Sequence, residues 1–448
     1  MTMRSRIDES LFTKDFGTDP FWWIAAPRPC SAAAHLPSET DALVIGAGVT
    51  GLNAARELAA AGTDVVVIDA SALGFGATSR NAGNIGRVLK HEFTSLVKKY
   101  GVRTATDIYL EMQAAYDVLE EVIKENDIDC HYRKCGRLIL AHTEKQLRIV
   151  ADECAAKKEH LNEEYHLLGK DDIGKELDTP LYVGAAYIPD SASIHPGLYH
   201  LGLIDAARRK GVKLVPETTA TRIRRIGSPT TKQRFAISTS KGVVTARDVI
   251  VATNGYSMDG VPNWIKRRLI PFDAYMIATD EIAPAQMSAI LPNNRVYIDA
   301  NRNLVFFRQS PDGKHILFGG RTGSKPPGDL RSMASALFKD ACKVLPALKD
   351  QKIFRGWTGR CAGTFDLYPH MGVHDGIPFA AGYCFAGMPM GTYLGSKLAR
   401  VILGMDGSET YFSTRSMPTM PFFSGNPWFV PHFMKMYDWL DSRDGGQP

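Results

Sequence analysis

Three glycines at a fixed spacing are the first residues with a recognisable chemical use. Gly46, Gly48 and Gly51 follow the apolar run 41–45 and open an alanine-rich segment. In such a unit the first glycine permits a tight turn, the second lets backbone N–H groups approach a diphosphate, and the third lets a helix pack closely on a strand. The spacing predicts a dinucleotide-binding turn, whose expected contacts are Gly46, Gly48, Val49, Thr50 and Gly51.

An acidic residue follows at the position where a ribose binds in such units. Asp69 ends the next apolar run, 64–69, and stands 18 residues after Gly51. A carboxylate there accepts hydrogen bonds from ribose hydroxyls, and Ala70 adjoins it in the same predicted site. The glycines alone also fit a purely structural turn, but strand, helix and acid in register favour dinucleotide binding. The pattern does not separate NAD from FAD.

A second loop of small and polar residues comes directly afterwards. Residues 74–85 read Gly-Phe-Gly-Ala-Thr-Ser-Arg-Asn-Ala-Gly-Asn-Ile. With this loop the chain resembles the flavoprotein superfamily of D-amino-acid oxidase, glycine oxidase and sarcosine oxidase, and the G-x-G-A-(S/T)-x-R-N-x-G pattern is similar to the γ-glutamylputrescine oxidoreductase branch. Stretches 250–256, 357–369 and 381–391 agree with it in order, so the resemblance covers about residues 38 to 405.

The resemblance implies FAD as the cofactor. Ser79, Arg80 and Asn81 are expected to face the pyrophosphate and the ribityl chain, because hydroxyl, guanidinium and amide donors suit an extended polyanion. Ala220 is expected beside the adenine, and the helix 391–403 is expected to aim its positive N-terminus at the flavin pyrimidine. The further contacts that the resemblance implies are Gly83, Asn84, Ala252, Thr253, Asn254, Gly387, Met388 and Gly391.

Members of the superfamily oxidise a C–N bond. A hydride leaves the carbon next to a neutral amine for flavin N5, and the imine is hydrolysed to an aldehyde or ketone. The resemblance thus implies an FAD-dependent amine oxidase or dehydrogenase with a small amine as substrate and oxygen or another electron acceptor. An amino-acid oxidase of the same fold, a tRNA-modifying flavoprotein and a non-catalytic flavin-binding protein are the alternatives.

Three departures from the superfamily pattern restrict these expectations. Cys361 stands where glycine oxidase and its relatives have a carboxylate-binding arginine, and Arg360 precedes it by one residue. Gly359 occupies the position of the cysteine that carries FAD in sarcosine oxidases, so we expect a non-covalent cofactor. Met388 replaces a histidine that many members have after the Phe-x-Gly segment.

Several cations and tyrosines are candidates for the substrate site. Arg360 and His370 are the candidate catalytic residues, although His370 fits a structural role equally well. For each arginine a salt bridge at the surface or between domains is the alternative. Charge near the flavin but displaced from position 361 predicts an amine whose anionic group lies some bonds from the reacting carbon. The candidate substrate contacts are Arg87, Tyr256, Tyr275, Arg308 and Arg321.

The elements that must position these residues follow from periodicity. Apolar runs of period two and helical repeats alternate up to about residue 260, and residues 273–320 alternate short strands and turns. We expect an α/β protein with a Rossmann-like FAD-binding domain of the GR2 type and an interleaved α+β substrate domain with a mostly antiparallel sheet. The predicted parts are an N-terminal extension (1–39), the FAD domain (40–100, 195–258 and 353–410), the substrate domain (101–194 and 259–352) and a C-terminal tail (411–448).

Composition excludes several classes of protein. The 448 residues include 53 Lys and Arg against 48 Asp and Glu, which gives a net charge of +5 without a basic stripe, so nucleic acid is not an expected partner. Seven cysteines without a C-x-x-C pair predict neither a disulfide framework nor a metal site, and favour the cytoplasm. No apolar stretch is long enough to span a membrane. The aromatic tail is expected to pack on the body, with an interfacial role as the alternative, and the oligomeric state is open.

Overall fold

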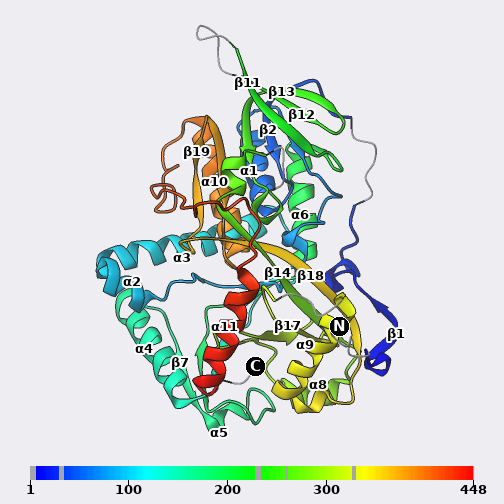
Figure 1. Cartoon of the computed structure of the whole chain (residues 1–448), viewed down its shortest axis with the longest axis vertical. Helices are drawn as coiled ribbons and strands as arrows, with labels where there is room; N and C mark the ends of the chain where they lie inside the picture. Colours follow the sequence, from blue (N-terminus) through cyan, green and yellow to red (C-terminus); the bar gives the residue numbers. More distant parts are fainter. Residues whose placement is uncertain (1–6, 30–34, 228–233, 258–260, 325–328, 447–448) are drawn as a thin grey trace.

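Two large β-sheets lie one above the other in the computed structural model, and helices cover both of them (Figure 1). The structure describes residues 7–29, 35–227, 234–257, 261–324 and 329–446. Within these residues no helix is long and apolar enough to cross a membrane.

The upper sheet is built around parallel strands. Its strands are β2 (Glu39–Ile45), β3 (Val65–Ile68), β10 (Lys213–Val215), β11 (Ala220–Ile226), β12 (Arg234–Thr239), β13 (Gly242–Val251), β19 (His370–His374) and β20 (Ile377–Ala381). The strands β10, β3, β2 and β13 run parallel side by side, β12 and β11 continue the sheet antiparallel, and β20 also pairs with β13. Val44 and Leu43 are fully buried on opposite faces, as expected of a parallel strand covered on both sides.

The helices on the upper sheet bring two helix N-termini together. They are α1 (Val49–Ala60), α2 (Phe93–Tyr100), α3 (Val102–Glu125), α6 (Pro196–Arg209) and α10 (Gly387–Leu403). α1 connects β2 to β3, and α10 packs against it through glycines: a Cβ atom on Gly395 would stand 2.5 Å from the carbonyl oxygen of Thr50. Only glycine permits this approach, which places the starts of α1 and α10 near each other.

The lower sheet is mostly antiparallel, as predicted. In spatial order its strands are β1 (Phe12–Gly17), β18 (Ile353–Thr364), β14 (Leu269–Thr279), β17 (Ile316–Gly320), β16 (Phe306–Gln309), β15 (Val296–Asp299), β6 (Arg137–Ala141), β8 (Gly184–Ile188) and β7 (His166–Gly169). Only the pairs β1 with β18 and β15 with β6 are parallel among the described residues. A separate core lies around its buried side chains, including Phe307 and Phe318.

Further helices surround the lower sheet. They are α4 (Glu144–Leu161), α5 (Lys170–Ile173), α8 (Pro284–Ile290), α9 (Leu330–Val344) and α11 (Val430–Arg443). The short helix α7 (Asn263–Lys266) packs on the upper sheet instead, where the Trp264 ring lies 4.9 Å from that of Phe379 in β20. Five 3₁₀ turns complete the described elements: η1 (Glu9–Leu11), η2 (Phe21–Trp23), η3 (Ala77–Ser79), η4 (Asn254–Tyr256) and η5 (Pro346–Leu348).

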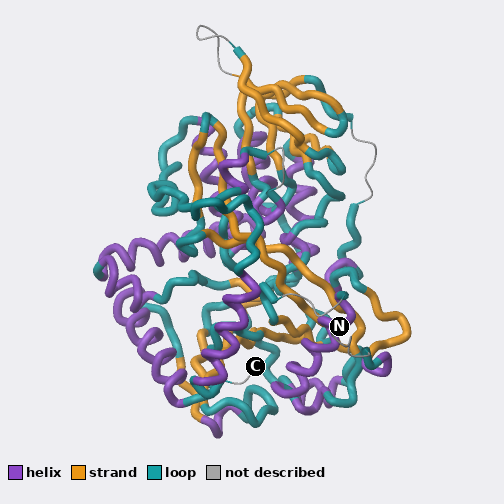
Figure 2. The backbone as a smooth tube through the Cα atoms, in the orientation of Figure 1, coloured by secondary structure: helices purple, strands orange, loops and turns teal. Residues whose placement is uncertain are grey.

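The long pair β14 and β18 joins the two layers. Its register runs without interruption from Leu269 opposite Thr364 to Ala278 opposite Arg355, and the two strands extend from the upper layer into the lower one (Figures 1 and 2). At the upper end a Cβ atom on Gly255 of η4 would stand 2.6 Å from the carbonyl oxygen of Cys361. The upper end of the pair therefore packs directly against the end of the parallel sheet.

A small third sheet connects the loop after β3 with β6. Its strands are β4 (Asn84–Ile85), β9 (Ala192–Ser193) and β5 (Arg133–Lys134), and β9 pairs with both others. Since β5 lies directly before β6, this sheet brings the segment that leaves residues 74–83 beside the start of β6.

The chain departs from the predicted boundaries at two places. Residues 353–410 were expected in the FAD domain, but β18, at their start, is the partner of β14 in the lower sheet. The N-terminal extension (1–39) was expected as a part of its own, but β1 pairs with β18 of the lower sheet. Both differences arise because strand pairing over a long distance leaves no local signature. Parts of the predicted boundaries, at 1–6, 30–34 and 258–260, lie outside the described residues.

The C-terminal tail forms a helix that is anchored at its end. Asp441 of α11 is 3% exposed and accepts a hydrogen bond of 2.9 Å from Arg302, which lies beyond β15. The tail thus packs on the lower layer, where α11 crosses it in Figure 1. Trp428 and Trp439 stay exposed, so its interfacial role stays an open prediction.

Candidate active site

One cavity of about 1290 Å³ runs from the carboxyl ends of the parallel strands to the space beside α4 and α11. This volume exceeds the roughly 300 to 1,000 Å³ of a pocket for one small ligand, so it has room for a dinucleotide and a substrate. We call the part lined by the ends of β2, β3 and β13 the cofactor end, and the part lined by α4, β6 and α11 the substrate end.

The turn after β2 has the geometry that a diphosphate requires. Gly46 has φ of +110°, and a Cβ atom there would stand 2.7 Å from the carbonyl oxygen of Ala252. Gly48 caps α1 without any side-chain hydrogen bond, so the positive end of this helix faces the cavity. Val49 and Thr50 also line the cavity, and Thr78 accepts a hydrogen bond of 3.0 Å from the Val49 N–H.

Asp69 stands at the end of β3 with its carboxylate held in place. Its two oxygens accept hydrogen bonds of 2.9 Å from the N–H groups of Ala47 and Ser71. Burial raises the pKa of Asp69, and these two hydrogen bonds oppose the rise. Ala70 lines the cavity beside it, and the Thr218 N–H donates to the Asp69 carbonyl at 2.7 Å, which brings Ala220 to the same wall.

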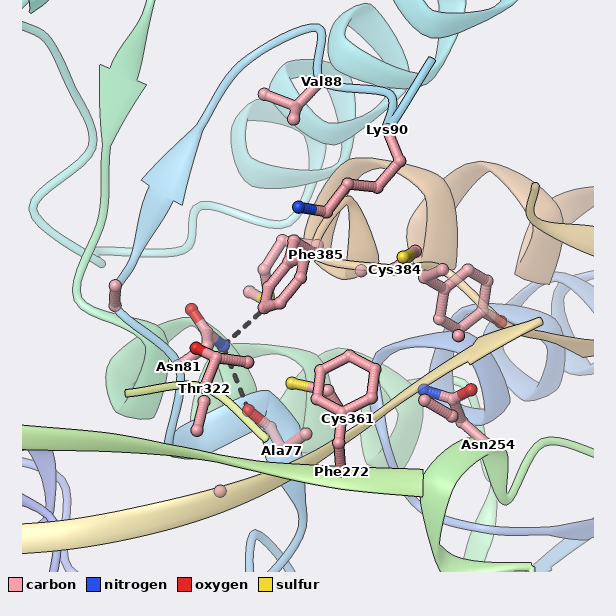
Figure 3. A pocket seen from close by; sticks show the side chains of 18 of the residues that line it. Ala77, Asn81, Val88, Lys90, Asn254, Phe272, Thr322, Cys361, Cys384 and Phe385 are labelled. Carbon is pink, nitrogen blue, oxygen red and sulfur yellow. Dashed lines mark hydrogen bonds between the residues drawn. The ribbon is translucent and has the colours of Figure 1, made fainter. Parts of the chain in front are cut away.

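The loop around η3 forms the next part of the wall. Asn81 donates to the carbonyl oxygen of Ala77 at 3.1 Å (Figure 3). It also donates to that of Thr78 at 2.8 Å, and its own side-chain oxygen accepts from the Gly83 N–H at 2.8 Å. Arg80 lines the cavity while donating to the Thr358 carbonyl at 3.0 Å. Asn84 lines it as well, and its buried Oδ1 has no hydrogen-bond partner in the described protein.

These observations test whether FAD fits the cavity. The positive N-terminus of α1, the oriented carboxylate of Asp69 and the unsatisfied amide oxygen of Asn84 are the groups that a diphosphate, ribose hydroxyls and a flavin donor would complete. Ala252, Thr253 and Asn254 follow β13 on the same wall, and Gly387 and Met388 begin α10 there. The residues present therefore fit the cofactor.

Four predicted cofactor contacts lie behind the wall and not on it. Ser79 is 3% exposed, donates to the Gly74 carbonyl and accepts 2.8 Å from the Trp23 indole, so the protein itself uses its hydroxyl. The three others are glycines at close approaches: an added Cβ would stand 1.9 Å from the Gly46 carbonyl oxygen at Gly51, 2.2 Å from that of Ile194 at Gly83, and 2.6 Å from Val49 at Gly391. They position the wall instead of lining it.

Side chains from both layers close the cavity near the cofactor end. Phe272 of β14, Cys361 of β18 and Phe385 before α10 surround one space in Figure 3. The ammonium group of Lys90 stands 4.9 Å from the centre of the Phe385 ring. The sequence motifs did not single out Lys90 or Phe272, although Lys90 follows Arg87 by three residues and Phe385 belongs to the stretch 381–391.

The predicted substrate arginines are engaged by the protein. Arg360 pairs with Asp273 at 3.0 Å, Arg321 pairs with Asp340 at 2.6 Å, and neither lines the cavity. Arg308 is 4% exposed and donates to the Ile194 carbonyl at 2.8 Å. Arg87 does line the cavity, but its guanidinium pairs with Glu163 and Asp190 at 3.2 and 2.8 Å. The salt bridges named as alternatives thus account for Arg87, Arg321 and Arg360.

Of the other candidate residues, one lines the cavity and two lie behind its wall. His370 is 1% exposed, lies off the cavity and binds Asp366 at 2.9 Å, which helps to lower the pKa of that carboxyl against its burial. Tyr275 is also buried behind the wall, where its hydroxyl donates to the Ser324 carbonyl at 3.2 Å. Tyr256 lines the cavity, and its hydroxyl accepts from the Arg360 N–H at 3.3 Å.

Three cysteines line the cavity, Cys154, Cys361 and Cys384, and the two nearest the cofactor end are poor nucleophiles. Burial raises the pKa of Cys361 to about 12 and that of Cys384 to about 11, so both thiols are protonated at neutral pH. All six cysteines of the described residues are free, and Cys30 lies outside them. Among the described residues no group of three or more His, Cys, Asp or Glu side chains is arranged to hold a metal ion.

Known proteins agree with this arrangement. The FAD dependent oxidoreductase (DAO) family matches residues 41–401, so the chain belongs to this family and is an FAD-dependent enzyme. The chain is 32% identical over 411 residues to gamma-glutamylputrescine oxidoreductase of Escherichia coli (strain K12), which covers 90% of this chain and 93% of the relative. It is 30% identical to the probable oxidoreductase OrdL of Haemophilus influenzae, over 85% and 86% of the two chains.

The fold has relatives among solved structures as well. Glycine oxidase from Geobacillus kaustophilus superimposes with a TM-score of 0.69 at 21% identity, over 86% of this chain and 99% of the other. The predicted family, fold class and cofactor are thereby confirmed. The roles of individual site residues stay predictions.

Proposed function

We propose that the protein oxidises the C–N bond of a primary or secondary amine that carries an anionic group, and that the imine is hydrolysed in water to an aldehyde or ketone. FAD, when bound, supplies the two-electron acceptor for the hydride that leaves the carbon next to nitrogen. The observation that carries the proposal is the continuity of the cavity: the wall that fits the cofactor passes without a break into an apolar chamber.

The residues of this chamber prepare the amine. Ile270, Phe272 and Phe385 give it an apolar wall, and such surroundings disfavour an ammonium ion relative to the neutral amine. The amine therefore leaves its proton with the solvent water as it enters, and the nitrogen lone pair that assists hydride departure becomes available. The high pKa values of Cys361 and Cys384 keep both thiols protonated at neutral pH, so neither cysteine acts as the base for the amine.

The positions of Cys361 and Arg360 favour an amine over an α-amino acid. The thiol stands where an α-carboxylate clamp is expected, and the guanidinium of Arg360 is held by Asp273 away from the cavity. An α-carboxylate would thus find no guanidinium at position 361, and the Lys90 ammonium group in the same space lies over the Phe385 ring instead. The identity of the relative from Escherichia coli, which its name connects with gamma-glutamylputrescine, supports an amine as the substrate class.

A panel of substrates under anaerobic conditions tests the proposal. Amines with and without a distal carboxylate, and α-amino acids as the comparison, are mixed with the FAD-loaded protein, and loss of flavin absorbance is followed in time. We expect bleaching by amines and little by α-amino acids. Bleaching by α-amino acids alone would identify an amino-acid oxidase or dehydrogenase, and no bleaching by any compound would favour a non-catalytic flavoprotein.

The acceptor and the location belong to the same proposal. The electron acceptor is oxygen or another small acceptor, and the free cysteines of the described chain support a reducing compartment such as the cytoplasm.

A further inference from the structure

An arginine at the substrate end has no hydrogen-bond or ion-pair partner in the part of the chain that the structure describes. Arg137 begins β6 and lines the cavity, and its Nε is buried without a hydrogen-bond partner. Among the described residues its guanidinium makes neither an ion pair nor a hydrogen bond, whereas Arg87, Arg321 and Arg360 each have a carboxylate. A buried cation without a partner is costly, so such a residue needs an explanation.

The neighbouring carboxylates are already used. Glu163 holds Arg87 at 3.2 Å. Glu153 pairs with Lys157 at 3.1 Å and also accepts hydrogen bonds from backbone N–H groups at the start of α2. Burial is the main cause that lowers the pKa of Arg137, and Glu163 opposes this effect, but a guanidinium stays charged in proteins. Arg87 and Lys157 thus have carboxylate partners, and Asp190 also pairs with Arg87 at 2.8 Å. Arg137 has no such partner among the described residues.

The position of Arg137 suits an anion remote from the reacting carbon. A Cβ atom on Gly86 would stand 3.4 Å from Nη1 of Arg137, and Gly86 directly follows β4. Gly86 follows Asn81, at the cofactor end, by five positions along the chain, which span at most about 18 Å. Tyr109, Ile139 and Val150 line the same part of the cavity. Their side chains form walls that suit the methylene chain of a ligand.

We propose that Arg137 binds the anionic group of the substrate, a carboxylate at the far end of a linear amine. The inference rests on the proposed function and makes its substrate class specific. A planar guanidinium binds both oxygens of a carboxylate at once, and this pairing would give Arg137 the partner that it lacks among the described residues. Arg137 thereby takes the role of substrate contact that the sequence predicted for other arginines. Unlike Arg137, the predicted residues Arg308, Arg321 and Arg360 do not line the cavity.

The experiment compares matched ligands on matched variants. Linear ω-amino carboxylates of increasing length and the n-alkylamines of equal length are assayed by anaerobic flavin reduction, and binding of linear monocarboxylates is measured by calorimetry. The variants are Arg137→Met, Arg137→Lys and Arg302→Met. Arg302 also lines the cavity, but it is paired with Asp441 and Asp444, so it controls for the loss of any cation.

We expect the parent to prefer the carboxylates at one chain length. In Arg137→Met this preference in kcat/KM should fall roughly 10- to 100-fold, the range for a hydrogen-bonded charged group, while kcat/KM for alkylamines and the FAD content stay unchanged. Arg137→Lys should retain part of the preference, because lysine keeps the positive charge but has no planar guanidinium to bind both carboxylate oxygens. Arg302→Met should retain all of the preference.

Other outcomes overturn the inference. A parent without a carboxylate preference, or an Arg137→Met protein that keeps it, would show that Arg137 has another role. If no amine reduces the flavin, the proposed function fails, but calorimetry still decides about Arg137. Monocarboxylate binding that weakens at least tenfold in Arg137→Met and not in Arg302→Met supports it, whereas equal or undetectable binding in all proteins refutes it.

Discussion

The two ends of the cavity are built by different means. At the cofactor end, backbone groups and short side chains follow β2, β3 and β13 directly, and the parallel sheet brings these strand ends to one edge. At the substrate end, the wall consists of long side chains from β6 and α4, which follow each other in sequence, and from the distant C-terminal helix α11. Local sequence therefore determines the residues of the cofactor end. At the substrate end, the ion pairs that form on folding determine which cations remain available to a ligand.

The largest expected effect breaks the cofactor end. Gly48→Val should abolish FAD binding, because the side chain would occupy the approach to the first turn of α1. The fold should persist, since a Cβ atom at Gly48 meets only Thr78 Oγ1, at 3.2 Å. Flavin absorbance per protein and circular dichroism measure the two properties. A variant that retains stoichiometric FAD would contradict the role of this glycine.

A second prediction concerns His195, the N-cap of α6, which packs on the upper sheet. His195 caps α6 by accepting from the Leu198 N–H at 3.1 Å, and burial, followed by His131 and Arg308, lowers the pKa of His195 to about 4. The native state then binds fewer protons than the unfolded chain between pH 6.5 and about 4, so stability present above pH 6.5 is lost as the pH falls through this window.

This loss should amount to roughly 3 kcal/mol at pH 4, given about 1.4 kcal/mol per pKa unit. His195→Asn keeps a capping side chain without the titration, and should flatten the curve of unfolding free energy against pH by that amount. Urea denaturation of the FAD-free protein at several pH values measures it. Identical pH curves for the parent and the variant would show that His195 is not the titrating group.

A smaller effect is expected for a paired arginine at the substrate domain surface. Arg360→Ala should change kcat/KM by less than about threefold and stability by at most about 1 kcal/mol, because exposed ion pairs contribute little. The side chains of Arg360 and Asp273 are 49% and 35% exposed. A large rise in KM with normal FAD content would restore Arg360 as a substrate contact and weaken the contrast with Arg137.

The smallest effect is expected at Cys361. Because burial keeps this thiol protonated, the flavin should separate from acid-precipitated protein, and Cys361→Ser should behave the same. Absorbance of the pellet and the supernatant measures the distribution. Yellow parent pellets that become colourless in the variant would demonstrate a covalent flavin.

Sequence predicted the cofactor end well for a physical reason. Gly46, Gly48 and Asp69 act through backbone geometry within one strand–helix–strand unit, so their spacing contains the information. Ser79 shows the limit of such a motif: it lies in the expected loop, but the Trp23 indole, 56 residues earlier, uses its hydroxyl. No local sequence pattern predicts this hydrogen bond between Trp23 and Ser79.

The substrate end was predicted less completely. Arg87, Arg321 and Arg360 were candidates because of their charge and segment, but only the tertiary structure reveals that Glu163, Asp340 and Asp273 face them. Arg137 lies outside every motif, and its significance is that it has no such partner. A sequence identifies which residues are cations, whereas folding determines which of them stay uncompensated.

The long pair of β14 and β18 also has a mechanical consequence. Ten consecutive register positions, from Leu269 to Ala278, tie the two layers together, and a rotation of one layer against the other would break this ladder. Hinge bending is thus an unfavourable way to admit a ligand. Entry and exit must instead rely on rearrangements of single side chains and loops, such as Phe385, which is 45% exposed, and these motions are faster than domain closure.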